Sequence, residues 1–342
     1  MSSANQSPWM FCNPRKINEL QWPRPSCWLA LLMVVSLWCV PAAAQSYAYV
    51  PTHKSNSVSV INTATNSVVA VVPVGIQPLS VAISPDGAFA YVTNSGWFAP
   101  NNDVSVISTA TNTVVATIPV GRFPIGVTFS PNGAVAYVVD SSDNNVSIID
   151  TVTRVVVSTV NVGMSPWGVA VTPNGAFAYV TNQTTNDVSV INTATKTIVT
   201  TVAVGSNPAG LAVTPDGALV YVANYLSNSV SVIATATNTV VSTIPVGTRP
   251  ITIAITPGGA SAYVPNDGDN NVSVINVPSN VVTATVAVES NPRGVAITPD
   301  GAFAYVSNRI SNTVSVISIA TNTVVGTVSG VAVFPESVAI KP

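Results

Sequence analysis

Short runs of apolar and polar residues alternate along nearly the whole chain from residue 45 onward. Val, Ile, Thr, Tyr and Phe dominate these runs, and such residues fit the pleated, half-buried surface of a β-sheet. In one representative stretch the runs lie at residues 168–172, 176–181, 187–192 and 197–204. Pro173-Asn174-Gly175 separates the first two runs. It predicts a tight turn, because Pro presets φ and Gly accepts a positive φ. The pattern predicts four antiparallel strands in each unit of about 40 residues.

A Tyr-Val pair marks the same point in every unit, and it begins at Tyr49, Tyr91, Tyr137, Tyr179, Tyr221, Tyr263 and Tyr305. Successive tyrosines are 42 residues apart, except at the second step, which spans 46. A fixed period of this length is typical of solenoids, propellers and arrays. With four strands per unit, the sequence predicts an all-β fold, a seven-bladed β-propeller of four-stranded antiparallel blades.

The two ends of the repeat region complement each other. The chain ends at residues 337–342, which read as the first strand of a unit, and residues 45–50 read as a second strand without its partner. A C-terminal innermost strand that joins the N-terminal blade would close the ring and leave no blade incomplete. A linear β-solenoid is the alternative, although it has no need of complementary ends.

The repeated motifs point to a known family. Tyr179-Val180-Thr181-Asn182, followed by Asp187-Val188-Ser189-Val190-Ile191 and preceded by Pro173-Asn174-Gly175, resembles the YVTN family of β-propeller repeats. The resemblance covers residues 45–342 and implies the propeller fold. Surface-layer proteins of archaea and exported bacterial propellers belong to that family. The resemblance implies no particular activity, because one fold hosts many functions.

Residues 1–44 differ in composition from the rest of the chain. Arg15, Lys16 and Arg24 precede an apolar run at 27–40, which ends in Pro41-Ala42-Ala43-Ala44. This order is typical of a secretory signal peptide, with cleavage expected after Ala44. We therefore expect export to the periplasm, the cell surface or the medium, with no stable membrane insertion after cleavage. Translation from Met10 and an uncleaved anchor are the alternatives.

Composition limits the chemistry of residues 45–342. All three cysteines, Cys12, Cys27 and Cys39, lie in the leader, so the repeats can form no disulfide and no thiolate metal site. Without the three basic residues and the one acidic residue of the leader, eight Lys and Arg face twelve Asp and Glu, a net charge of −4. This balance argues against nucleic-acid binding and against a polybasic membrane patch.

Side chains that depart from the repeat gather in two kinds of loop. In a propeller, the loops between second and third strands share one face with the crossing loops between blades, and loops on a rigid scaffold commonly carry binding sites. The departing residues predict a face that binds a protein, a glycan or a small ligand: His53, Lys54, Trp97, Phe98, Arg122, Phe123, Tyr225, Arg249 and Arg309. Trp97 and Phe98, in the insertion of the 46-residue step, are interpreted either as an anchor for a partner or as a lid over the neighbouring blade.

Signals for catalysis or metal binding are sparse. His53 is the only histidine, which excludes a site with several histidines and requires any Ser-His-Asp triad to use it. A solvated loop histidine is the simpler interpretation. Asp267-Gly268-Asp269 resembles the opening of a calcium loop, but Val272 and Pro278 stand where such a loop needs Gly and Glu. Turn chemistry explains these aspartates, and we expect no cofactor.

The residue after each crossing-loop proline leads into an innermost strand. These seven residues should surround the channel entrance: Leu79, Ile125, Trp167, Ala209, Ile251, Arg293 and Glu336. Arg293 and Glu336 belong to neighbouring blades and are predicted to form an ion pair, with Trp167 across the channel. One interpretation is a small-ligand site with Trp167 as a stacking platform. The other is a salt bridge at the rim, with Trp167 plugging the channel.

Three functions remain open from the sequence. The leading hypothesis is an exported, non-enzymatic binding or scaffold propeller, and the second is a lactonase-like hydrolase or lyase with its site at the channel mouth. The third is a structural component of a surface layer. Titratable side chains converging on the channel favour an enzyme, and an exposed apolar patch on a blade flank favours assembly.

Overall fold

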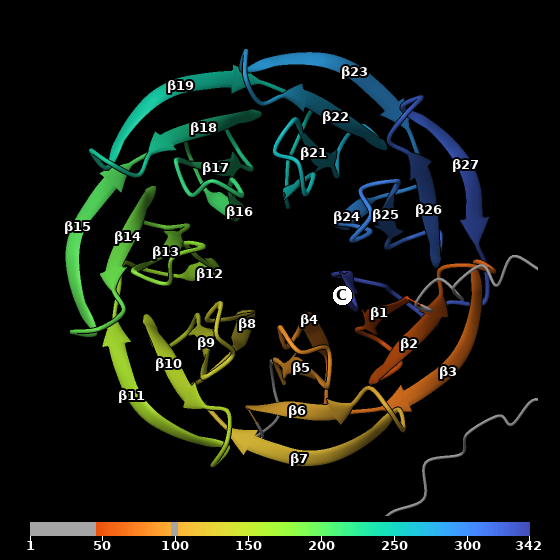
Figure 1. The fold of residues 1–342 in the computed structure, drawn as a ribbon, viewed down its shortest axis with the longest axis horizontal. Coiled ribbons are helices and arrows are strands. Elements are labelled where there is room, and N and C mark those ends of the chain that lie inside the picture. The colour runs from red at the N-terminus through yellow and green to blue at the C-terminus, as the bar shows by residue number, and fades with distance from the viewer. Residues whose placement is uncertain (1–45, 97–101) are drawn as a thin grey trace, which may run out of the picture. The chain divides into compact units, whose positions relative to one another are not determined.

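A computed structural model describes residues 46–96 and 102–342. Seven four-stranded antiparallel sheets are arranged as blades around a central channel (Figure 1). This confirms the predicted seven-bladed β-propeller. The predicted signal peptide, Trp97 and Phe98 lie outside the described residues. Among the described residues, no helix is long and apolar enough to cross a membrane.

In every blade the first strand named lies at the channel and the last lies on the outside of the ring, and the first blade named joins the two ends of the repeat region. The seven blades are β28 (Ala339–Ile340), β1 (Tyr47–Thr52), β2 (Ser57–Asn62) and β3 (Ser67–Pro73); β4 (Pro78–Ile83), β5 (Phe89–Asn94), β6 (Asp103–Ser108) and β7 (Thr113–Pro119); β8 (Pro124–Phe129), β9 (Val135–Asp140), β10 (Asn145–Asp150) and β11 (Val155–Asn161); β12 (Pro166–Val171), β13 (Phe177–Asn182), β14 (Asp187–Asn192) and β15 (Thr197–Ala203); β16 (Pro208–Val213), β17 (Leu219–Asn224), β18 (Ser229–Ala234) and β19 (Thr239–Pro245); β20 (Ala254–Ile255), β21 (Ser261–Asn266), β22 (Asn271–Asn276) and β23 (Val281–Ala287); and β24 (Pro292–Ile297), β25 (Phe303–Asn308), β26 (Thr313–Ser318) and β27 (Thr323–Val328).

The ring closes where the sequence predicts. Strand β28 pairs antiparallel with β1, with Ala48 opposite Ile340 and Tyr49 opposite Ala339. The backbone N–H of Lys341 donates to the carbonyl of Tyr47 at 2.8 Å. The first blade therefore takes its innermost strand from the C-terminal end of the chain, and the linear solenoid is wrong.

The hydrophobic core lies between blades rather than within them. A typical cluster joins Tyr137, Val146 and Ile148 of one blade to Ala178 and Val180 of the next. Equivalent clusters fill the other blade interfaces, including the interface across the closure. Since fully burying each large apolar side chain contributes about 1.5–3 kcal/mol, every blade depends on both of its neighbours.

The repeated tyrosine also makes a polar contact between blades. The Tyr179 hydroxyl donates to Asn238 Oδ1 at 2.7 Å, in the outer turn of the next blade. The same bond recurs from Tyr49 to Asn112, Tyr221 to Asn280, Tyr263 to Asn322 and Tyr305 to Asn66. In these five blades tyrosine therefore offers more than phenylalanine would, because its hydroxyl has a hydrogen-bond acceptor on the neighbouring blade.

Asparagines hold the loops of the variable face. In each blade an asparagine accepts a backbone N–H from the following crossing loop, and in six of the seven blades that asparagine has a positive φ, for example Asn186 (φ 57°). These bonds measure 2.8–3.0 Å and run from Gln77 to Asn56, Phe123 to Asn102, Ser165 to Asn144, Asn207 to Asn186, Arg249 to Asn228, Asn291 to Asn270 and Phe334 to Asn312. The Asn-rich loops thus satisfy the backbone and leave the other side chains free to vary.

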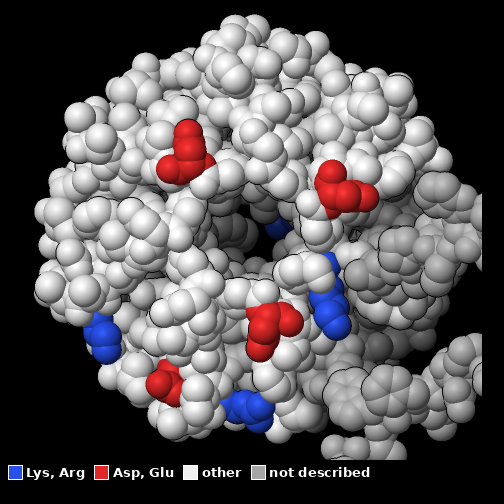
Figure 2. Space-filling model, in the orientation of Figure 1, with Lys and Arg blue, Asp and Glu red and all other residues white. Residues whose placement is uncertain are grey.

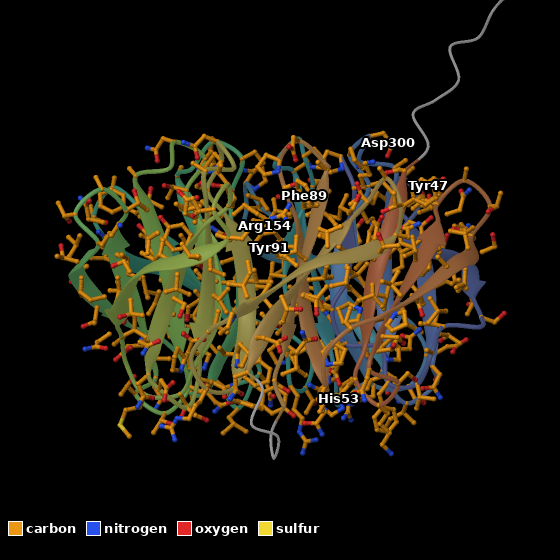
Figure 3. The ribbon with its side chains drawn as sticks, turned by 90° about the horizontal axis from the view of Figure 1, so that it is seen from below. Tyr47, His53, Phe89, Tyr91, Arg154 and Asp300 are labelled. Atoms are coloured by element: carbon orange, nitrogen blue, oxygen red, sulfur yellow. The ribbon has the colours of Figure 1, made fainter. Side chains whose placement is uncertain are left out.

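The two faces of the ring lie at opposite ends of the strands. Figure 3 places His53, in a loop of the variable face, at one end and Asp300, in a Pro-Asp-Gly turn, at the other. Figure 2 shows the turn face, where charged groups are few and acidic ones stand around the channel opening. The candidate site lies at the other end of the channel, among the variable loops.

Candidate channel-mouth site

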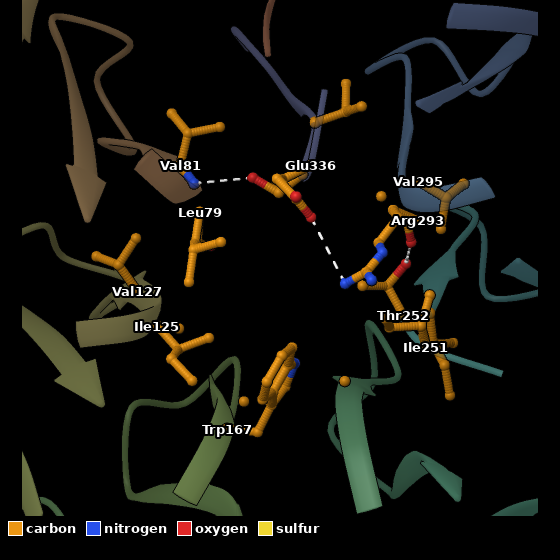
Figure 4. A pocket seen from close by; sticks show the side chains of 18 of the residues that line it. Leu79, Val81, Ile125, Val127, Trp167, Ile251, Thr252, Arg293, Val295 and Glu336 are labelled. Atoms are coloured by element: carbon orange, nitrogen blue, oxygen red, sulfur yellow. Dashed lines mark hydrogen bonds and ion pairs between the residues drawn. The ribbon is translucent and has the colours of Figure 1, made fainter. Parts of the chain in front are cut away.

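Six of the seven residues predicted to surround the channel entrance line a cavity of about 210 Å³: Leu79, Ile125, Trp167, Ile251, Arg293 and Glu336. Ala209 does not line it and is only 1% exposed. The prediction for Ala209 is wrong because its methyl group is too short to reach the cavity, which Gly210 and Leu211 line instead. Figure 4 shows Trp167 across the cavity from Glu336, with Arg293 beside them.

Hydrogen bonds between blades fix the backbone of this ring. A hydroxyl of one blade donates to the carbonyl of a ring residue in the next, from Thr93 to Ile125 (2.7 Å), Thr181 to Ala209 (2.5 Å), Thr252 to Arg293 (2.5 Å) and Ser307 to Glu336. The carbonyls of Arg293 and Glu336 are therefore both satisfied. Their side chains leave the backbone from rigid positions, as a preorganised site requires.

A glycine brings the arginine strand close to the glutamate. A Cβ atom on Gly294 would lie 2.7 Å from the carbonyl oxygen of Glu336 and 2.5 Å from Cα of Ser337. Any larger residue would push the two inner strands apart, because real Cβ atoms do not approach backbone atoms this closely. The close approach places Arg293 and Glu336, which start on adjacent blades, at one side of the cavity.

Four charged side chains from two loops and two crossing segments meet at this side of the channel. Arg293 Nη1 lies 3.6 Å from Glu336 Oε2, which confirms the predicted ion pair. Arg309 Nε donates to Glu336 Oε1 at 2.7 Å, and Arg293 Nη2 lies 3.9 Å from Asp267 Oδ2. Glu336 is 6% exposed and Arg293 is 23% exposed. Glu336 is therefore a buried carboxylate shared by two guanidinium groups.

Asp267 is held by its own loop neighbours. Asn291 Nδ2 donates to Asp267 Oδ1, and the Tyr225 hydroxyl donates to Asp267 Oδ2 at 3.5 Å. Asp269 Oδ2 accepts the backbone N–H of Thr248 at 2.6 Å, so the two aspartates of the calcium-like motif point to different partners. Within residues 46–96 and 102–342, no three His, Cys, Asp or Glu side chains are grouped so that they could hold a metal ion.

His53 lies beside the charged cluster instead of in solvent. It is half-buried, its backbone N–H donates to the carbonyl of Phe334 at 2.9 Å, and its Nδ1 is buried with no partner among the described residues. Burial lowers the pKa of His53 below its usual value, although the charge of Glu336 acts in the opposite direction. The imidazole is therefore mainly neutral at pH 7, and the side chain is only partly solvated, because its Nδ1 is buried.

Phe334 joins the cluster through its ring. Lys54 Nζ and Arg309 Cζ each lie 4.4 Å from its centroid, a distance at which a cation is attracted to an aromatic face. Phe334 has a φ of 61°, a costly conformation for a bulky residue. The residue before the crossing-loop proline has a positive φ in every blade, and Phe334 is a bulky residue at that position. An aromatic residue at this place in the repeat is the sequence signal that points to Phe334.

The remaining loop residues make local contacts. Arg122 binds Asp143 at 2.6 Å on the surface, and Phe123 donates its backbone N–H to Asn102 at 3.0 Å. Arg249 lies 5.9 Å from the centroid of the Tyr225 ring, whose hydroxyl bonds Asp267. Within residues 46–96 and 102–342, only Asp267, Arg293, Arg309 and Glu336 form a network of ion pairs at the channel.

Comparison with known proteins identifies the fold and two similar structures. Residues 151–243 and 237–342 match the family described as "Lactonase, 7-bladed beta-propeller". The structure of Kuenenia stuttgartiensis hydrazine synthase is similar to this one, with 25% sequence identity and a TM-score of 0.74, over 80% of this chain and 92% of that chain. A functionally unknown protein from Desulfotomaculum acetoxidans DSM 771 is 20% identical, with a TM-score of 0.76 over 86% of this chain and 98% of that one. No curated protein matches the chain.

Proposed function

Because the chain belongs to the lactonase family of seven-bladed β-propellers, we propose that it is an exported, YVTN-type propeller that binds a small molecule at the channel mouth. One observation carries the proposal: the guanidinium of Arg293 faces the cavity without a contact at hydrogen-bond length. Its buried Nε has no partner among the described residues. A ligand oxygen in the cavity would give the Nη groups the hydrogen bond that they lack, and a hydrogen bond to a charged group contributes about 1.5–3 kcal/mol.

The opposite wall supplies the apolar half of the site. Trp167 lies across the cavity from Glu336, and Leu79, Ile125 and Ile251 complete the apolar lining (Figure 4). A mostly apolar pocket with a few convergent polar groups is typical of small-ligand sites. The cavity volume of about 210 Å³ limits the ligand to a small molecule.

A thermal-shift screen of small molecules tests this function. A ligand present at a hundred times its Kd adds about 2.7 kcal/mol to the stability of the folded state, which raises Tm by several degrees. We expect this increase in the wild type and its loss in Trp167→Ala and in Arg293→Ala. Arg122→Ala, at an arginine of the same face that pairs with Asp143 on the surface, is the matched control and should keep the full shift. If every hit stabilises all four proteins equally, the channel-mouth site is wrong.

Lactone hydrolysis is a second candidate, favoured by His53. Its imidazole is neutral at pH 7 and interacts electrostatically with Glu336, Arg309 and Arg293, so a base and two cations lie near the cavity. A neutral imidazole can deprotonate water, and a guanidinium can stabilise a developing oxyanion. A panel of lactones, followed by acid release with wild type and His53→Gln, tests it. Turnover that persists in a folded His53→Gln variant would remove this histidine from the reaction.

The outer strands weigh against assembly as a surface layer. They expose valines, including Val157 (47%), Val199 (52%) and Val241 (56%), which is the apolar flank that favours assembly. Each outer strand, however, shifts register against its neighbour by a bulge, as between Ile148 and Ile149 of β10. Bulges twist an edge away from a flat partner and are a known protection against strand pairing between molecules.

Export is part of the proposal and rests on the composition of residues 1–44. N-terminal sequencing of protein from the producing cell should give Gln45 as the first residue. A chain that still carries residues 27–40 would indicate an anchor at the membrane instead.

A further inference from the structure

One of the two carboxylates at the channel mouth is only half paired. Glu336 Oε1 accepts from Arg309 at 2.7 Å, whereas Oε2 lies 3.6 Å from Arg293. Asp267 accepts through both oxygens, from Asn291 at Oδ1 and from the Tyr225 hydroxyl at Oδ2, and its Oδ2 lies 3.9 Å from Arg293. Charge-assisted hydrogen bonds are normally about 2.7–2.9 Å long. Arg293 is therefore attracted by both carboxylates and bonded to neither.

The buried charges of this cluster balance. Arg293 and Arg309 offset Asp267 and Glu336, and the neutral His53 adds nothing at pH 7. Lys54, over the Phe334 ring, adds a further positive charge, but it is exposed to solvent. A ligand with a net negative charge would stand beside two buried carboxylates that already share the two guanidinium groups. A ligand with a net positive charge would meet both guanidinium groups. Since buried charges are tolerated only when paired, the cluster favours a ligand that brings both signs.

The spacing of the loose ion pair shows where such a ligand fits. Arg293 and Glu336 both line the cavity, and their closest side-chain atoms are 3.6 Å apart, with no hydrogen bond between them. Opening this pair breaks no hydrogen bond, and Glu336 stays held by Arg309. A negative group can then bind Arg293 while a positive group binds Glu336 Oε2, and both new bonds can reach the normal length.

We propose that the channel mouth binds a small zwitterion, an α-amino acid with an apolar or aromatic side chain. Its carboxylate binds the guanidinium of Arg293, its ammonium group binds Glu336 Oε2, and its side chain packs on Trp167 across the cavity (Figure 4). The inference rests on the proposed function, because it names the chemical class of the small molecule bound at that site. It assigns opposite roles to two side chains, and those roles can be tested separately.

Calorimetry with L-phenylalanine and its two truncated analogues is the first test. 3-Phenylpropanoate lacks the ammonium group and 2-phenylethylamine lacks the carboxylate, while all three keep the aromatic ring. Because hydrogen bonds between charged groups contribute about tenfold or more to affinity, we expect each analogue to bind at least about tenfold more weakly than the amino acid. L-leucine, 4-methylpentanoate and 3-methylbutylamine form a second series for an aliphatic side chain.

Two charge-removing variants assign the partners. In Arg293→Gln, L-phenylalanine should lose about tenfold in affinity or more, whereas 2-phenylethylamine should bind no more weakly than to the wild type. In Glu336→Gln, the loss should appear for L-phenylalanine and not for 3-phenylpropanoate. Arg122→Gln is the matched control and should change none of these affinities. If Glu336→Gln does not fold, the opposite responses expected in Arg293→Gln decide the question alone.

The outcomes separate the inference from the function on which it rests. If a simple carboxylate or a neutral lactone binds as tightly as the amino acids, and binding needs Trp167 and Arg293, the zwitterion is wrong and the small-molecule site stands. An amino acid that binds equally to wild type and Arg293→Gln also overturns the inference. If no compound of any of these classes shows binding that depends on Trp167 and Arg293, both proposals are wrong.

Discussion

The two faces of the ring solve the same backbone problem in different ways. On the turn face a tight turn bonds its own backbone: Asp300 Oδ1 accepts from Thr298 Oγ1 at 2.5 Å and from the Ala302 N–H at 2.9 Å, and Gly301 has a φ of 70°. On the variable face an asparagine of one loop accepts from the following crossing loop, as Asn186 does from Asn207, and in five blades a second side chain of that loop, such as Asp269, accepts from the preceding crossing loop. The tight turns therefore use their side chains locally, and the variable face holds its crossing loops with one or two residues per blade.

This difference explains why the charged cluster lies on the variable face. Asn270 and Asn312 accept backbone N–H groups of their crossing loops. The side chains of neighbouring residues such as Arg293, Arg309 and Glu336 are therefore not needed to hold the backbone of these loops. They can then take side chains that reach across to another blade. A rigid scaffold with free loop positions is where binding sites are usually built. Changes on the turn face should thus affect stability alone, and changes at the channel mouth should affect binding.

The closure strand runs from one face to the other, so its removal should have the largest effect. Deleting residues 337–342 removes β28 and exposes the apolar cluster that contains Val338 and Ile340. Losing several buried side chains costs several kcal/mol, and we expect Tm to fall by about 10 °C or more. Removing only the exposed Pro342 is the control and should leave Tm unchanged. Equal melting of the two truncated proteins, measured by circular dichroism, would show that closure does not stabilise the ring.

A buried carboxylate on the variable face should give the next largest effect. Asp140 stands where five other blades have asparagine, and burial raises its pKa to about 7, while Ser147 Oγ donates to Oδ2 at 2.6 Å. An acid that titrates near 3.8 when unfolded and near 7 when folded binds more protons in the folded state, so stability falls as pH rises between these values. Asp140→Asn should therefore stabilise the protein above pH 7, by at most about 4 kcal/mol.

Urea unfolding at several pH values checks the sign for Asp140→Asn. The gain over the wild type should be absent below about pH 4, grow up to about pH 7 and stay constant above it. Asp143→Asn, which removes a surface ion pair nearby, is the matched control and should change stability by less than about 1 kcal/mol. A gain for Asp140→Asn that is the same at pH 4 and pH 8 would mean that the carboxyl does not titrate as described.

The smallest expected effect belongs to the tyrosine bond between blades. Tyr179→Phe removes the hydroxyl that donates to Asn238 at 2.7 Å, which should cost about 1 kcal/mol and leave ligand binding unchanged. Tyr137→Phe is the matched control, because Lys196 stands in register where five blades place that asparagine. Thermal unfolding should show a larger loss for Tyr179→Phe. Equal losses would mean that the asparagine acceptor contributes nothing measurable.

The fold could be predicted because the turns, the strands and the ends of the repeat region all follow the same period in the sequence. Tight turns, alternating strands and complementary ends all repeat with one spacing, and the strands at 187–192 and 197–203 appear where the pattern places them. The same register predicted that Arg293 and Glu336 are neighbours, since it assigns both to one ring of positions. The register of the repeat fixes where each backbone position lies, so residues at the same repeat position on adjacent blades are predicted to be neighbours.

The rest of the site could not be predicted because it depends on side-chain reach. Arg309 and Asp267 lie in loops of different blades, and nothing in the repeat says that their side chains turn toward the channel. His53 shows the same limit, since its burial results from the C-terminal segment at Phe334, which is remote in sequence. Ala209 shows the opposite error: its register position is right, but a methyl group does not extend into the cavity. The repeat period predicts the position of each backbone segment, whereas the direction of a side chain depends on how it packs.

The closure strand also sets the order of events during folding. Ser46 Oγ donates to the carbonyl of Lys341, a contact between residues 295 positions apart. Loop-closure entropy opposes such a contact until the blades between have formed and brought the ends together. Blades whose four strands are consecutive in the chain can assemble from local hairpins as they emerge during synthesis. The blade that contains β1 is therefore the last of the seven to be completed, and its inner edge stays unpaired until residues 339 and 340 have been synthesised.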